Sequence, residues 1–436
     1  MRYALASLLI LMGVVFPLEA QENTEDDVIE IEILWFDDGS ESQTLTALLD
    51  VFMEQNPGVN VDLEVNSARE TNRRLQERLN ALDMPDLARS NIPGGFRDEL
   101  LDLRPYLEDP EAWEQNFRDD FLAGLRADPT TDGLYGYPTD ITISAPYINR
   151  SLWERAGVPI PSYVKDNPTW EDWIVGATEV QAALTNNRND IYAIGIDATG
   201  HRFWGPSLSR CASYVQGFGT PTEQVTIDTA GFRDTAEMLR QWHRNELIPS
   251  DIWLGDMDGD PPERMFIDGK LAFYFSGNWH LNNFQNRIND FEWEVVPNPT
   301  GDCGKTGMVG GSVMIAFEQT EHPEVVGDLV DFLTQYDNLR QFYTENLILP
   351  GHTGMIQETL YPSGSADLRR FQQELANAKE EAFVLQYRPD SFLLHSNIRD
   401  GLQTMLVEDL TLDETVSLIE QEIGIIPAAP DDEPAG

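Results

Sequence analysis

The stretch FSGNWHLNNF (275–284) places an amide, an indole and an imidazole side by side, directly after the apolar run LAFYF (271–275). A lone tryptophan most often buries apolar area in a core. A tryptophan that leaves a strand at its end can instead contact a ligand. Whether Trp279 is core or ligand-binding therefore depends on the elements around it.

Other polar and aromatic residues stand where predicted strands end. Trp35, Phe36 and Asp37 close the run VIEIEILWF, and Asn91 follows the run DLARS. Trp35 is compatible both with a lobe core and with the rim of a binding site. One of Asp37 and Asp38 is expected to be a solvated acid that does not contact a ligand. Gly310, Gly311 and Ser312 form a tight strand entry that lets backbone amides approach a ligand, although a simple bulge explains the glycines equally well.

Motifs of common enzymes and metal sites are missing from the sequence. It has no G-x-S-x-G, phosphate-binding loop or H-E-x-x-H, and its six histidines and two cysteines show no metal-ligand spacing. We therefore expect no cofactor, no metal and no catalytic residue. Cys211 and Cys303 are an even pair that can form one disulfide in an oxidising compartment, or stay free. A secreted glycoside hydrolase remains a rival, because 75 acidic residues supply carboxylate pairs everywhere.

Composition narrows the partners and the compartment. The 436 residues carry 75 acids against 29 bases, a net charge of −46, which should repel nucleic acid and anionic membrane surfaces. An apolar stretch from about Leu5 to Phe16 follows Arg2, and a small residue, Ala20, stands at the expected cleavage point. This is the pattern of a cleavable signal peptide (1–20). No cysteine stands near the cleavage point for lipid attachment. We expect an exported periplasmic monomer with a flexible acidic tail (427–436).

The elements that must position these residues alternate between strands and helices. Residues 28–36 and 59–65 alternate with period two, residues 84–90 form a third short strand, and leucines at helical spacing lie between them. This β-α-β-α-β order predicts an α/β fold whose mainly parallel sheet is flanked by helices and binds ligands at the carboxyl ends of its strands. Thr169 and Asp172 form a capping box for a helix that buries Trp170 and Trp173.

Several segments in order resemble family 1 extracellular solute-binding proteins, the sugar-type receptors of ABC importers to which maltose-binding proteins belong. The matching segments are DMPDL (83–87), GLYGYP to PTWEDW (133–173), FIDGKLAFYFSGNW (266–279), VVPNP (295–299) and VGGS (309–312). Each segment alone is weak, and the ordered set is specific.

The resemblance implies a two-lobed periplasmic-binding-protein fold of type II with three hinge crossings, near Asp140, Pro297 and Pro350. The lobes would comprise 21–140 with 298–349, and 141–297 with 350–436. It also implies that a carbohydrate is held in the cleft and delivered to a membrane ABC permease.

The ligand contacts that the resemblance implies combine aromatic rings with planar polar groups. Trp279 matches the tryptophan of the family's G-x-W element, and Phe203 and Trp204 stand where the family places an aromatic residue on the second lobe. Asp37, Asn91 and Asp140 are candidate hydroxyl acceptors, although Asp140 also fits an ordinary turn. Phe392 and His395 are weaker candidates. Thr142 replaces a carboxylate that maltose-type members often carry. The alternatives within the same fold are a polyamine, a polyol or a glycerol-phosphate-type solute.

Overall fold

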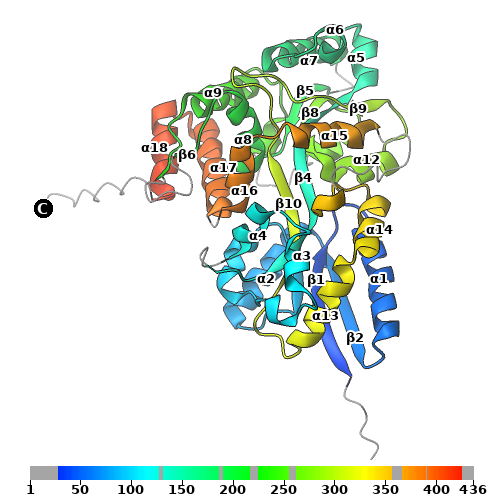
Figure 1. The fold of residues 1–436 in the computed structure, drawn as a ribbon. Helices are drawn as coiled ribbons and strands as arrows, with labels where there is room; N and C mark the ends of the chain where they lie inside the picture. Colours follow the sequence, from blue (N-terminus) through cyan, green and yellow to red (C-terminus); the bar gives the residue numbers. More distant parts are fainter. Residues whose placement is uncertain are drawn as a thin grey trace, which may run out of the picture.

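Two lobes, joined by long strands, make up the molecule (Figure 1). The computed structural model describes residues 28–126, 131–185, 190–216, 224–254, 262–355, 366–388 and 390–424. The predicted signal peptide and the predicted acidic tail lie outside the described residues.

The first lobe, at the bottom of Figure 1, contains the predicted β-α-β-α-β unit. β1 pairs in parallel with β2 on one side and with β3 on the other, which confirms the predicted order. Since β1 lies between two strands, its second half is apolar on both faces and buried. The elements of this lobe are β1 (Ile29–Phe36), α1 (Glu41–Gln55), β2 (Val59–Asn66), α2 (Ala68–Ala81), β3 (Leu87–Ser90), the 3₁₀ helices η1 (Pro93–Glu99) and η2 (Arg104–Tyr106), α3 (Pro110–Glu114), α4 (Asp119–Leu125), α13 (Pro323–Thr334) and α14 (Tyr336–Asn346).

The second lobe gathers its helices around β5 and β8, which pair in parallel. The predicted capping box is present, because Thr169 accepts from the N–H of Asp172 and the Asp172 side chain accepts from the N–H of Thr169. The elements are α5 (Arg150–Ala156), α6 (Pro161–Val164), α7 (Trp170–Leu184), β5 (Tyr192–Ile196), α8 (Gly200–Ser209), β6 (Val215–Gln216), β7 (Gln224–Val225), α9 (Ala230–Arg244), α10 (Ser250–Leu254), α11 (Pro262–Ile267), β8 (Leu271–Gly277), the 3₁₀ turn η3 (Asn278–His280), α12 (Leu281–Arg287), β9 (Trp293–Val295), α15 (Ala366–Ala376), α16 (Glu380–Tyr387), α17 (Ser391–Glu408) and α18 (Leu412–Glu422).

Two strands are shared by the lobes, β4 (Gly136–Asn149) and β10 (Val309–Ala316). They are antiparallel partners, and together they join both lobes into one sheet of order β2-β1-β3-β10-β4-β8-β5, with β9 on β4. β4 runs through Asp140 without a break, so the predicted lobe boundary there falls inside a strand. β9 is short and ends at Val295, and Pro297 and Pro299, which follow it, cannot donate hydrogen bonds to a sheet.

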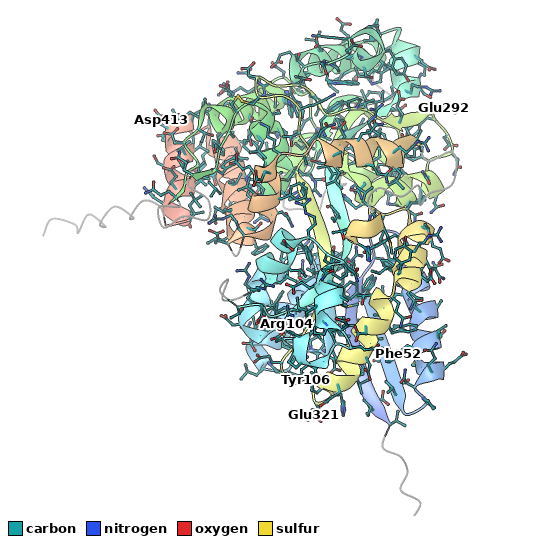
Figure 2. The ribbon with its side chains drawn as sticks, viewed as in Figure 1. Phe52, Arg104, Tyr106, Glu292, Glu321 and Asp413 are labelled. Carbon is teal, nitrogen blue, oxygen red and sulfur yellow. A yellow bond between two sulfur atoms is a disulfide. The ribbon has the colours of Figure 1, made fainter. Side chains whose placement is uncertain are left out.

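The core of the second lobe contains several tryptophans. Trp170 and Trp173 are buried, as predicted, and so is Trp242 on α9. The side-chain view places Phe52 and Arg104 with the first lobe and Glu292 with the second (Figure 2). Among the helices that the structure describes, none has the length and apolar character needed to cross a bilayer.

Candidate interlobe binding site

A cavity of about 510 Å³ opens between the two lobes at the shared strands. Its first-lobe wall comes from the ends of β1 and β3 and from α2, and its second-lobe wall comes from the ends of β5 and β8 and from α8 and α17. Carboxyl ends of parallel strands gather at one edge of a sheet, which is the place where α/β proteins bind ligands. The lining residues are Phe36, Asp38, Ala68, Asn72, Asn91, Ile92, Thr142, Asp197, Thr199, His201, Arg202, Glu263, Trp279, His280, Gly310, Gly311, Ser312, Gln386, Phe392, His395, Ser396 and Arg399.

On the first lobe, a buried arginine holds the aromatic ring of Phe36 in place. The guanidinium carbon of Arg89 lies 4.3 Å from the centre of the Phe36 ring, and its Nη1 donates to the Phe36 carbonyl at 2.7 Å. Its Nη2 donates to Asp38 at 3.2 Å and to Asp140 at 3.1 Å. Asp140 also accepts from the N–H of Ser312 at 3.1 Å, which ties this cluster to β10.

Two carboxyl groups near Arg89, those of Asp38 and Glu41, have raised pKa values. Burial raises the pKa of Asp38, while the charge of Arg89 opposes this and the charges of Glu41 and Asp140 add to it. Burial also raises the pKa of Glu41, whose side chain accepts from the N–H groups of Asp38 and Gly39 before α1 begins. The positive charge of Arg89 therefore counteracts the effect of burial on both pKa values.

On the second lobe, another arginine covers the ring of Trp279. The guanidinium carbon of Arg202 lies 4.0 Å from the ring centre. Its Nε donates to Asp197 at 3.1 Å, and its Nη1 lies 2.6 Å from Nδ1 of His201. Asp197 follows β5 directly and accepts from the hydroxyl of Tyr274 at 3.0 Å. The indole is thus held by a chain of charged and polar contacts rather than by apolar packing alone.

Three largely buried histidines complete this wall and are uncharged at neutral pH. Burial lowers the pKa of His280 to about 4 and of His395 to about 3, and it lowers the pKa of His201 well below its usual value. Nε2 of His201 lies 3.0 Å from the carbonyl oxygen of Val309, so it donates there and its Nδ1 accepts from Arg202. A neutral imidazole can both donate and accept a hydrogen bond, which suits a ligand rich in hydroxyl groups.

The floor of the cavity is formed by β4 and β10. Gly311 has a φ of 146° and lies so close to β4 that a Cβ on it would come within 2.4 Å of the Asp140 carbonyl oxygen. Only glycine fits this position, and its presence brings the β10 backbone against β4. Thr142 lies opposite Gly310 in the register and also lines the cavity.

Comparison with known proteins places this arrangement in a family. A family model described as bacterial extracellular solute-binding protein matches residues 47–366, about three quarters of the chain. The chain belongs to this family.

Relatives of this solute-binding protein are distant in sequence and close in fold. A protein of Brucella abortus (strain 2308) named as a binding protein is 22% identical over 336 residues, which cover 75% of this chain and 77% of the relative. The arabinooligosaccharide-binding protein of Halalkalibacterium halodurans is 22% identical over 273 residues, 59% of this chain and 55% of that protein. Maltose-bound MalE3 of T. maritima aligns with a TM-score of 0.72 at 16% identity, covering 91% of this chain and 99% of that one. At that identity the alignment shows the fold.

Within the solute-binding protein, five of the ten predicted ligand contacts line the cavity. They are Phe36, Asn91, Trp279, Gly311 and Ser312. The two weaker candidates, Phe392 and His395, line it as well. Each stands at the end of a strand, at the strand entry of β10, or on the first turns of α17.

The other five predicted contacts lie behind the wall, and their placement corrects the expectation. Trp35 neighbours Phe36 on a strand, so it faces the opposite side, where its ring lies 6.0 Å from Phe342. The Trp35 indole N–H donates to Asp37 at 2.8 Å, and Asp37 also accepts from the N–H of Ser42 in the first turn of α1. Both residues build the lobe rather than the cavity surface.

Phe203, Trp204 and Asp140 likewise support the wall from behind. Phe203 packs against Phe232 at 5.2 Å, and Trp204 is fully buried with its ring 4.2 Å from that of His395. At the start of α8, His201 and Arg202 line the cavity, whereas Phe203 and Trp204 lie on the buried side of the helix. Asp140 is buried in its ion pair with Arg89.

Sequence reasoning missed most of the polar second-lobe wall. Asp197 and His201 follow β5, so the strand-end rule could have found them. His280 is not among the predicted contacts, yet it lines the cavity beside Trp279. No sequence signal marks Glu263 or the α17 residues Ser396 and Arg399, because helix packing alone brings them to the cavity.

A disulfide joins Cys211, just after α8, to Cys303 in the segment that leads from β9 to β10. The Cα atoms are 5.1 Å apart, and the N–H of Cys303 donates to the Ser209 carbonyl at 2.9 Å. The bond therefore anchors one crossing segment to the helix that carries His201 and Arg202.

Proposed function

We propose that this protein is the substrate receptor of an ABC importer and binds a neutral carbohydrate, a mono- or oligosaccharide, in the interlobe cavity. The observation that carries the proposal is the half-buried ring of Trp279 in the cavity; the ring of Phe36, 1% exposed, lies in the opposite wall. A sugar has flat apolar C–H faces that stack on such rings and hydroxyl edges that need planar donors and acceptors. Asn91 and the neutral imidazoles of His280 and His395, which line the cavity, supply those groups.

The balance of charge favours an uncharged ligand. The acidic and basic side chains at the cavity contact one another: Asp38 and Asp140 share Arg89, Asp197 pairs with Arg202, and Arg399 pairs with Asp400 at 2.7 Å. Glu263 accepts from Asn283, and burial raises its pKa. A polyamine would need unpaired acids, and a glycerol phosphate would need unpaired bases.

The size of the cavity and the relatives fit a sugar ligand. A volume of about 510 Å³ lies within the range of about 300–1,000 Å³ that is usual for small-molecule sites. The name of one relative specifies arabino-oligosaccharides, and one similar structure contains maltose. Because Thr142 stands where maltose-type members often have a carboxylate, we do not assign maltose itself.

The mechanism follows from the two-walled site. A sugar binds first to one lobe, and the other lobe closes over it, because the ligand has a higher affinity for the closed state. The hinge lies where β4 and β10 pass between the lobes. The closed receptor then docks on a membrane permease as an exported, periplasmic monomer. We assign it no catalytic activity, in keeping with a family of binding proteins.

A thermal-shift screen tests the proposal. Wild-type protein is heated with mono- and disaccharides, arabino-oligosaccharides, polyols, polyamines and glycerol phosphate. A ligand at a hundred times its Kd adds about 2.7 kcal/mol to the free energy of unfolding, so a sugar should raise the Tm and leave the sugar unchanged on chromatography. A shift with polyamines alone, or hydrolysis of the sugar, would overturn the assignment.

A further inference from the structure

Asn278 makes an unusual connection between the cavity and the hinge. It is the first residue of η3, next to Trp279, and only 1% of its surface is exposed. Its Oδ1 accepts from the N–H of Ile143 at 2.8 Å, and its Nδ2 donates to the carbonyl of Ile141 at 3.4 Å. Both partners are backbone groups of β4, on either side of the cavity residue Thr142.

The side chain of Asn278 takes the place of a missing strand. β8 pairs with β4 only as far as Gly277 and Ser144, where the chain turns away into η3. Beyond this point the edge of β4 still presents a buried N–H and a carbonyl, which need partners. The amide of Asn278 supplies both, and so it extends the sheet by one peptide-like group toward the first lobe.

Ile141 is the point where the segments that pass between the lobes meet. It belongs to β4, its register partner on β10 is Gly311, and its N–H donates to the carbonyl of Leu349 at 3.0 Å. Leu349 precedes Pro350, where the third crossing is expected. A bond from Asn278 to the carbonyl of Ile141 therefore connects the turn that carries Trp279 to the residue where β4, β10 and the segment before Pro350 meet.

We propose that Asn278 is a positioning residue that couples the ring of Trp279 to the hinge. The inference rests on the proposed function, because it assumes that Trp279 contacts the ligand. Bending at Ile141 then moves the turn of η3 together with β4, so hinge closure and ring placement become one event. A ligand that engages the ring favours the closed hinge, and a closed hinge favours the ring position that the ligand needs.

Spin labels on the two lobes measure this coupling without any ligand. Cysteines replace Val51 on α1 and Val175 on α7, two exposed positions, and the native cysteines stay in their disulfide. Asn278→Ala should broaden the distribution of interlobe distances relative to the parent protein. Asn278→Asp keeps the acceptor for Ile143 and loses the donor to Ile141, so it should broaden the distribution as well.

Asn346→Ala is the matched control. Asn346 is 2% exposed and donates to the Phe342 carbonyl and to Thr44 within the first lobe. The control should lower the Tm and leave the distance distribution unchanged. An unchanged distribution in Asn278→Asp, or equal broadening in Asn346→Ala, would refute the coupling, and the aspartate variant decides alone if the alanine variant does not fold.

Ligand affinity gives a second readout, with maltose and arabinobiose as probes. Where a probe binds the parent protein, Asn278→Ala should weaken its affinity by about tenfold, in the usual range of coupling between sites, while Asn346→Ala leaves it unchanged. Equal affinities of all three proteins would contradict the coupling. If neither probe nor any other sugar binds, the proposed function fails, and the label distances still decide the role of Asn278.

Discussion

Acid should destabilise this protein through the neutral histidines of its cavity, and His280 offers the cleanest test. Its side chain is 13% exposed, its ring stacks on Phe284 at 5.1 Å, and its Nε2 lies 3.1 Å from the Tyr274 hydroxyl. Burial lowers its pKa from 6.5 to about 4, Asp197 opposes this, and Arg202 adds to it.

The sign and size of the effect follow from proton uptake. Above pH 6.5 neither the folded nor the unfolded His280 is protonated, and the folded state keeps its full stability. As the pH falls below 6.5, the histidine of the unfolded chain becomes protonated, whereas that of the folded protein stays neutral down to about pH 4. At about 1.4 kcal/mol per pKa unit, this lowers the free energy of unfolding by about 2 kcal/mol at pH 5 and by about 3 kcal/mol at pH 4.

Urea unfolding at pH 7.5, 6 and 5 measures this loss in the wild type and in His280→Gln, which keeps a polar group and cannot gain a proton. The wild type should lose about 2 kcal/mol more than the variant between pH 7.5 and pH 5. His395 contributes in both proteins and cancels in the comparison. Asn286→Ala, a change at an exposed position of α12, the helix that follows His280, should follow the wild type. Parallel pH profiles for the wild type and His280→Gln would refute the reasoning.

Three further predictions concern single features. Trp279→Ala should weaken sugar binding by about 1–3 kcal/mol, the value of burying a large aromatic side chain, with the fold intact by circular dichroism; unchanged affinity in calorimetry would remove Trp279 from the site. Replacing Cys211 and Cys303 together by serine should lower the free energy of unfolding by about 2–5 kcal/mol, since the bond closes a loop of 92 residues; an unchanged urea midpoint would contradict this. Thr169→Ala should cost about 1 kcal/mol by removing the capping box of α7, and a change below 0.3 kcal/mol in chemical unfolding would count against it.

Local patterns predicted the elements well, because strand alternation and helix caps depend on neighbouring residues. VIEIEILWF and VNVDLEV became β1 and β2 in parallel register, and Thr169 with Asp172 caps α7 as the sequence indicated. The family resemblance was also confirmed by the family model, which matches residues 47–366.

The direction of individual side chains was much harder to predict. Trp35 and Phe36 are both aromatic and adjacent, so composition could not show which one faces the cavity. Within four consecutive residues of α8, His201 and Arg202 line the cavity and Phe203 and Trp204 are buried in the core. Predicting this division requires knowing that the helix begins at Gly200. The buried ion pair of Arg89 and Asp140 joins residues 51 positions apart, and no local pattern encodes it.

The shared strands β4 and β10 also constrain how the chain reaches its native state. β10 lies between β3 and β4 in the sheet, so the first lobe lacks an interior strand until Ala316 has been synthesised. Strand pairings between residues far apart in the sequence form late, because the entropy of closing the loop is lost before the new contacts stabilise the chain. A nascent chain therefore cannot complete the sheet of the first lobe before most of the second lobe has been synthesised.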